Sequence, residues 1–245
     1  MEQDEKKDKA HIFYQEVLEL LNAHNLPFLV GGAFALGHYT GLHRDTKDID
    51  LFCKVEDYPS FLKLFEKHNY KIEVTDPRWL AKAFKGEYFV DLIFNAVNNL
   101  TPVDDSWFAH ESKGELFQIP VKFIAAAELL WMKLYIQNRE RYDGADINHL
   151  ILRYGKNINW HRLWMHMKKH WQLLLAQFIN FQFVYPSDRQ IIPEWLFKEL
   201  LALAAKQNDL PTPVEKVCLG PLIDQTQYKV DVLEWKYKSF TTETL

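Results

Sequence analysis

Apolar residues in the first part of the chain recur with two different periods. A spacing of three to four residues predicts helices, whereas short apolar runs and strict alternation predict strands. Before residue 100 we expect helices over residues 11–24, 33–39 and 59–68, and strands over residues 28–30, 48–54, 70–74, 79–84 and 88–94. Because helices and strands alternate along this segment, it predicts a mixed α/β sheet.

The pattern changes after Pro120 and becomes mainly helical. We expect helices over residues 125–138, 144–153, 159–178 and 193–206, while residues 227–235 fit a last strand and a short helix equally well. The predicted fold class is therefore α/β (α+β), with a mixed-sheet core over residues 1–120. A mainly helical C-terminal region over residues 121–245 is expected to pack on that core.

Composition narrows the class of protein. The chain has 245 residues and a net charge of −4, whereas a protein that coats nucleic acid is usually basic. Cys53 and Cys218 lie far apart and form no metal or disulfide pattern, so we expect a reducing cytoplasm. No apolar stretch is long enough to span a bilayer, so we expect no membrane partner. The charged start, residues 1–10, is typical of a frayed terminus.

Two aspartates stand one residue apart in a predicted strand. Side chains alternate between the faces of a strand, so Asp48 and Asp50 share one face while Ile49 and Leu51 point into the core. Two like charges on one face repel, and a divalent cation relieves that repulsion. Carboxylate oxygens suit Mg²⁺, with Mn²⁺ as a substitute. A solvated strand face without a cation is the alternative.

A third carboxylate lies in the apolar run over residues 88–94, where Asp91 is the sole charge. A buried carboxylate is costly unless it is paired or binds a metal ion. If this strand lies beside the first, Asp91 completes a cluster that can hold two metal ions about 3.5–4 Å apart. A strand-edge residue without such a role is the alternative for Asp91.

Gly31 and Gly32 stand between a predicted strand and a predicted helix. Glycines allow close approach of the backbone to a ligand, and a helix N-terminus offers N–H donors to phosphate. We therefore expect these glycines to bind a nucleotide. Arg44 and Lys47, just before the aspartates, are candidates for contacts with phosphate oxygens. Charge balance for the acidic cluster explains the two cations equally well.

The order of strand, Gly-Gly, short helix, Arg-x-Thr-x-Asp-Ile-Asp-Leu and a later strand with one Asp resembles the DNA polymerase β-like nucleotidyltransferase superfamily. Within it, the chain is most similar to small bacterial nucleotidyltransferase-like proteins, a group that neighbours the AbiEii-related toxins. The resemblance covers roughly residues 28–94. It implies that Asp48 and Asp50 are the metal-binding pair, that Asp91 is the third carboxylate, and that Gly31 and Gly32 hold the phosphates.

A weaker resemblance continues over residues 120–150. It implies functional positions at Lys133, at Arg139 or Arg141, and at Asp143 or Asp146. By its chemistry, Lys133 on an apolar helix either binds phosphate or extends to water. The two aspartates, three residues apart at a predicted helix start, are close to a capping box, which we favour.

Three histidines and several basic residues share the predicted helix over residues 159–178. His166 and His170 are four residues apart, but no Glu completes a zinc-hydrolase motif. We therefore interpret this surface as a basic, solvated helix face.

The sequence predicts a nucleotidyltransferase. The expected reaction moves a nucleoside monophosphate from an NTP to an acceptor hydroxyl on a small molecule, a tRNA or a protein. The alternative is a non-catalytic scaffold that binds a nucleotide or a partner protein, for instance within a toxin–antitoxin pair, because a fold does not fix a function.

Overall fold

The computed structural model describes residues 2–44, 46 and 48–239. The chain divides into two compact units, which we call the sheet unit (residues 1–125) and the helical unit (residues 126–245). Within the described residues, none of the helices has the length and apolar character needed to cross a membrane.

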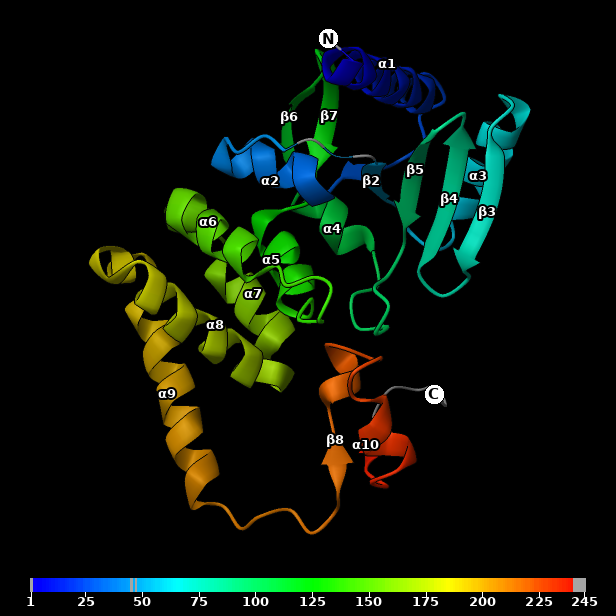
Figure 1. Ribbon diagram of the computed structural model, residues 1–245. Helices are drawn as coiled ribbons and strands as arrows, with labels where there is room; N and C mark the ends of the chain where they lie inside the picture. The colour runs from blue at the N-terminus through cyan, green and yellow to red at the C-terminus, as the bar shows by residue number, and fades with distance from the viewer. Residues whose placement is uncertain (1, 45, 47, 240–245) are drawn as a thin grey trace. The chain divides into compact units, whose positions relative to one another are not determined.

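Helices and strands alternate through the described part of the sheet unit, and the predicted α/β fold class is confirmed (Figure 1). They are α1 (Glu2–Ala23), β1 (Leu29–Val30), α2 (Gly32–Thr40), β2 (Asp48–Phe52), α3 (Tyr58–Lys67), β3 (Lys71–Asp76), β4 (Leu80–Lys85), β5 (Tyr88–Ile93), α4 (Asp105–Ala109), β6 (Ser112–Leu116) and β7 (Ile119–Phe123). The charged start of the chain, expected to be frayed, is helical from Glu2.

The strands form one seven-stranded sheet in the order β3-β4-β5-β2-β1-β7-β6. The pairs β2–β5 and β1–β7 are parallel, and β1–β2, β3–β4, β4–β5 and β6–β7 are antiparallel. In the centre, Ile49, Leu51, Val90 and Leu92 are completely buried. This apolar face anchors β2 and β5, and it leaves the alternating positions of both strands on the opposite face.

The β6–β7 hairpin is absent from the sequence prediction. Phe117 and Gln118 form its turn with φ of 53° and 65°, a backbone region in which tight hairpin turns usually place Gly or Asn. The turn therefore carries no recognisable signal in the sequence. The expected boundary after residue 120 falls inside β7.

The helical unit contains α5 (Ala126–Leu134), α6 (Gly144–Tyr154), η1 (Gly155–Asn157), α7 (Trp160–Met167), η2 (Lys168–His170), α8 (Trp171–Val184), η3 (Pro186–Ile191), α9 (Glu194–Asp209), β8 (Val217–Cys218), η4 (Gly220–Leu222), α10 (Lys229–Leu233) and β9 (Lys238–Ser239).

Three predictions in the helical unit need correction or completion. The helix expected over residues 159–178 is interrupted by η2, where His170 turns inward and its Nδ1 lies 2.7 Å from the Tyr135 hydroxyl. The helix expected over residues 125–138 ends at Leu134. The ambiguous segment, residues 227–235, contains the short helix α10.

Candidate active site

The Gly31-Gly32 turn brings the start of α2 against β2. The Gly31 amide donates a hydrogen bond to the Asp50 carbonyl oxygen (2.9 Å). Gly32 has φ of +54°, and a Cβ built there would lie 1.7 Å from Asp50 Oδ2. The Asp50 carboxylate therefore lies beside the N-terminus of α2, where the backbone N–H groups favour negative charge. A side chain at position 32 is unfavourable, because the backbone has a positive φ and the Asp50 carboxylate occupies the space of a Cβ.

Asp48 and Asp50 share one face of β2, as predicted, and both are half-buried. The Thr46 hydroxyl donates a 2.6 Å hydrogen bond to Asp48 Oδ1 and thereby orients that carboxylate. Ile49 and Leu51 on the opposite face are fully buried, so packing fixes the direction in which the aspartates point.

Asp91 lies on β5 directly beside Asp50, because the parallel register of β2 and β5 pairs these two residues. The antiparallel register of β4 places Lys82 opposite Asp91, and Lys82 Nζ donates to Asp91 Oδ1 over 2.6 Å. We call the surface that carries Asp48, Asp50 and Asp91 the acidic face. The expectation that the two strands are neighbours is confirmed, and Lys82 is a component that the sequence reasoning missed.

Burial and the charges of the acidic face shift the pKa values of two groups, Asp91 and Tyr14. Burial raises the pKa of Asp91, the charge of Asp48 adds to that increase, and Lys82 opposes it. Burial also raises the pKa of Tyr14 on α1, and the charges of Asp48 and Asp50 contribute. The Tyr14 side chain is 1% exposed, and its hydroxyl has no hydrogen-bond partner among the described residues.

The donor atoms of the acidic face fit a hard cation. Carboxylate oxygens are the ligands that Mg²⁺ prefers, and Mg²⁺ is commonly held by one or two carboxylates together with substrate phosphates. Asp48 and Asp50 supply such a pair. Within the described residues, no three His, Cys, Asp or Glu side chains converge closely enough to hold a metal ion. Asp91, the predicted third ligand, is instead bound to Lys82.

Three further residues were predicted to contact the nucleotide. Arg44 is exposed in the segment before β2. Lys47 lies outside the described residues. Lys133 is buried in the helical unit on α5, where its Nζ donates to Asp143 Oδ2 (2.6 Å) and to Asp146 Oδ2 (2.8 Å). Lys133 thus neither extends to water nor stands without a partner, and its contact with a nucleotide stays a prediction.

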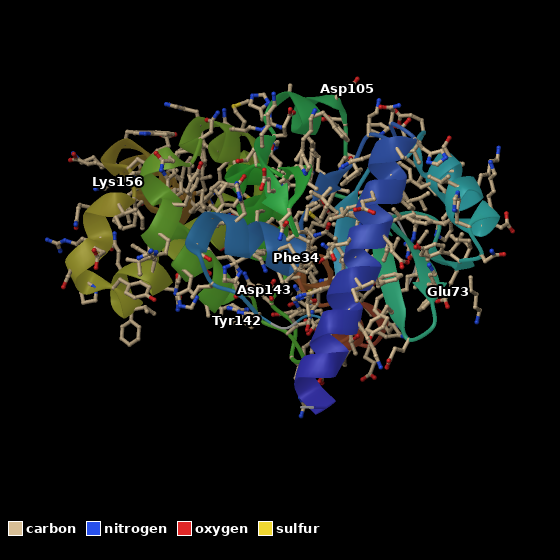
Figure 2. All side chains as sticks on the ribbon, turned by 90° about the horizontal axis from the view of Figure 1, so that it is seen from above. Phe34, Glu73, Asp105, Tyr142, Asp143 and Lys156 are labelled. Carbon is tan, nitrogen blue, oxygen red and sulfur yellow. The ribbon has the colours of Figure 1, made fainter. Side chains whose placement is uncertain are left out.

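The capping interpretation of Asp143 is wrong. Asp143 occupies the N-cap position of α6, but its side chain makes no capping hydrogen bond within the described part of the chain. It binds Lys133 and Arg141 instead. Burial alone would raise the pKa of Asp143, but the hydrogen bonds and charges of Arg141 and Lys133 hold it below its usual value. Figure 2 shows Asp143 beside Tyr142 at the start of α6. A buried ammonium requires anionic partners, and this requirement outweighs capping.

The basic helix face is also reinterpreted. Glu128 on α5 is completely buried and binds Arg162 and His166 of α7, with His166 Nε2 at 3.3 Å. The His166 ring stacks on Trp131 at a centroid distance of 3.9 Å. Because His170 contacts Tyr135, the two histidines have separate protein partners, and part of this face is inside the unit.

Over residues 11–169, the chain matches the family described as "Nucleotidyl transferase of unknown function (DUF2204)". The chain belongs to this family. The predicted nucleotidyltransferase superfamily is thereby confirmed, whereas the narrower relation to AbiEii-like toxins is not. The comparison with curated proteins gave no match.

Several solved structures are similar to this chain at low sequence identity. The antibiotic-resistance factor ANT(2'')-Ia matches with a TM-score of 0.51 and 16% identity, covering 69% of this chain and 95% of that chain. The lincosamide antibiotic adenylyltransferase LnuA matches with a TM-score of 0.42 and 21% identity, covering 57% and 94%. JHP933 from Helicobacter pylori matches with a TM-score of 0.42 and 14% identity, covering 85% and 97%. The likeness to ANT(2'')-Ia supports the fold of the family.

Proposed function

We propose that this chain catalyses the Mg²⁺-dependent transfer of a nucleoside monophosphate from an NTP to an acceptor hydroxyl, with release of pyrophosphate. One observation carries the proposal. The acidic face and the N-terminus of α2 meet at Asp50 and Gly32, which supports a cation site next to a phosphate site. Family membership supports nucleotidyl transfer as the reaction class.

Each side chain has a role in this proposal. Asp48 and Asp50 hold the cation, and Asp91 is the third carboxylate ligand, with Mn²⁺ able to replace Mg²⁺. When bound, the cation neutralises charge on the triphosphate. The backbone N–H groups at Gly31 and Gly32 bind phosphate oxygens, and Arg44 and Lys47 are further proposed phosphate contacts.

Bond making and breaking follow from this arrangement. The acceptor oxygen forms a bond to the α-phosphorus, the bond from that phosphorus to the bridging oxygen breaks, and pyrophosphate leaves. Asp91 receives the proton of the acceptor hydroxyl. Positioning and electrostatic stabilisation supply most of the rate enhancement in this class of reaction.

The acceptor is proposed only as a hydroxyl on a small molecule, a tRNA or a protein. ANT(2'')-Ia is described in complex with adenylyl-2''-tobramycin. Antibiotics that carry hydroxyl groups are therefore the first acceptors to screen. The two free cysteines, Cys53 and Cys218, agree with a reducing cytoplasm as the place of the reaction.

The first experiment is a thermal-shift measurement with each NTP, with and without Mg²⁺. We expect at least one NTP to stabilise the wild type in a Mg²⁺-dependent manner, and we expect Asp48→Asn/Asp50→Asn to abolish that shift. Glu56→Gln/Asp105→Asn is the matched control. It removes two negative charges from exposed positions around Lys54 and should keep the shift.

The outcomes separate the proposal from its alternatives. Loss of the shift in both double variants would argue against a role specific to the acidic face. Mg²⁺-dependent binding without transfer of an α-phosphate label to any acceptor would favour the non-catalytic scaffold. Growth arrest on overexpression, relieved by Asp48→Asn, would support the narrower toxin relationship.

A further inference from the structure

Lys82 is a positively charged side chain at the acidic face. It lies on β4, one strand beyond Asp91, and the register aligns Lys82, Asp91 and Asp50 in one row across the sheet. Its Nζ lies 2.6 Å from Asp91 Oδ1 and 4.3 Å from the centroid of the Phe89 ring. The hydrogen bond and the ring together hold the ammonium group beside the carboxylate.

Glu73, the next residue in this row, does not compete with Asp91 for Lys82. Glu73 on β3 pairs with Lys82 in the register, but it is exposed and accepts a hydrogen bond from the Thr75 hydroxyl (3.2 Å). The side chains of Lys82 and Asp91 are 21% and 13% exposed. The pair is therefore partly shielded from water, where a charge interaction is stronger than at an open surface.

We propose that Lys82 competes with a divalent cation for Asp91. This inference rests on the proposed function, because it concerns the same cation site. A cation can bind at Asp48 and Asp50 while Lys82 stays in place. A cation that uses Asp91 must first break the Lys82 hydrogen bond and then tolerate a like charge nearby. Lys82 thus sets the order of binding: Asp48 and Asp50 first, Asp91 second.

The inference assigns Lys82 a role that a purely structural ion pair does not have. A structural pair would change only the stability of the sheet when it is removed. A competitor also changes the affinity of Asp91 for a cation. Lys82→Met keeps the aliphatic stem over Phe89 and removes the charge, so it separates these two roles.

The experiment measures Mn²⁺ binding by electron paramagnetic resonance and equilibrium dialysis, in the presence of a non-hydrolysable NTP analogue. The chains compared are wild type, Lys82→Met, Lys82→Arg, Lys82→Met/Asp91→Asn, Asp48→Asn/Asp50→Asn and the control Lys85→Met. Lys85 is the last residue of β4, is about half exposed and pairs with Glu16, so Lys85→Met removes the same charge from the same strand. Circular dichroism confirms that each variant is folded.

We expect Lys82→Met to strengthen binding of an Asp91-dependent Mn²⁺ by roughly tenfold or more, or to add that ion where the wild type lacks it. The gain should vanish in Lys82→Met/Asp91→Asn. Lys82→Arg, which retains the charge, and Lys85→Met should bind as the wild type does. Unchanged or weaker Mn²⁺ binding by folded Lys82→Met would overturn the inference. If Mn²⁺ still depends on Asp48 and Asp50 in that case, the proposed function stands; if no chain binds Mn²⁺, both fail.

Discussion

Each unit of this protein contains a lysine beside aspartates, and the two groups differ in charge balance and in burial. In the sheet unit, Lys82 binds Asp91 on a face that also carries Asp48 and Asp50. In the helical unit, Lys133 binds Asp143 and Asp146, and Arg141 adds a second positive charge. Among the described residues named here, the first group has three carboxylates and one cation, whereas the second has two of each.

The two groups also differ in how deeply their side chains are buried. The side chains of Lys133, Asp143 and Asp146 are only 5%, 7% and 11% exposed, while Asp48 and Asp50 are half-buried. In a charge-balanced cluster with buried carboxylates the members compensate one another, and removing one of them leaves the others uncompensated. An unbalanced and partly open cluster keeps capacity for an added cation. The number and exposure of the carboxylates, more than the presence of a lysine, therefore mark the candidate active site.

The largest effect is expected from Lys133→Met. Removal of the ammonium leaves Asp143 and Asp146 buried with less compensation, so the free energy of unfolding should fall by about 3–5 kcal/mol. Lys82→Met, at the partly exposed pair, should lower it by no more than about 1 kcal/mol. Urea unfolding followed by circular dichroism measures both values. Equal losses in the two variants would remove the distinction between the clusters.

Restoring neutrality provides the control. Lys133→Met/Asp146→Asn removes one of the stranded charges and should recover part of the stability lost in Lys133→Met. A double variant that is less stable than the single variant would show that the charge imbalance is not the cause of the loss.

The second-largest effect is expected from Gly32→Ala. A Cβ at position 32 meets the Asp50 carboxylate, and alanine disfavours the positive φ that this position adopts, so we expect a loss of about 2 kcal/mol and loss of the Mg²⁺–NTP thermal shift. Gly41→Ala is the matched control. Gly41 has φ of +74° with nothing within 4 Å of the added Cβ, so strain alone should cost about 1 kcal/mol and nucleotide binding should persist. Intact nucleotide binding in Gly32→Ala would contradict the placement of the site at this turn.

Local patterns predicted the part of the site that lies on β2 and β5. Alternation places Asp48 and Asp50 on one face, and a lone charge in an apolar run identifies Asp91. Both signals arise within a few residues of the chain, where the geometry of a strand determines which side chains share a face. The Gly-Gly turn was predicted for the same local reason.

Side-chain contacts between segments that lie far apart in the chain could not be predicted from local sequence patterns. Lys82 was visible as a single charge in the strand predicted over residues 79–84, but only the antiparallel register shows that it faces Asp91. Lys133 and Asp143 lie ten positions apart, a separation that no helical or strand spacing relates. The β6–β7 hairpin was missed because Phe117 and Gln118 adopt positive φ without the usual turn residues.

A smaller effect is expected from Tyr14→Phe. The Tyr14 hydroxyl is buried without a hydrogen-bond partner among the described residues, so its removal should raise the free energy of unfolding by about 1 kcal/mol. Tyr39→Phe is the control, because the Tyr39 hydroxyl donates to the Ile124 carbonyl oxygen (2.8 Å) and its loss should cost about 1 kcal/mol. Guanidinium unfolding at neutral pH measures both. A destabilised Tyr14→Phe would indicate that the hydroxyl is satisfied in solution.

The smallest effects are expected in the pH dependence of stability, where Asp143 and Asp91 should act in opposite directions. The pKa of Asp143 is lowered by folding, so its contribution is present above its unfolded pKa, about 3.9, and is lost as the pH falls through the folded pKa. The pKa of Asp91 is raised, so its contribution is present below about pH 3.9 and is lost as the pH rises through the folded pKa.

Urea unfolding with a metal chelator, at a series of acidic pH values, tests these signs. The stability advantage of wild type over Asp143→Asn should shrink as the pH falls. The advantage of wild type over Asp91→Asn should instead shrink as the pH rises. The same sign for both residues would mean that Lys82 compensates Asp91 as fully as Lys133 and Arg141 compensate Asp143. The acidic face would then have no unbalanced carboxylate at Asp91, and its capacity for a cation would be confined to Asp48 and Asp50.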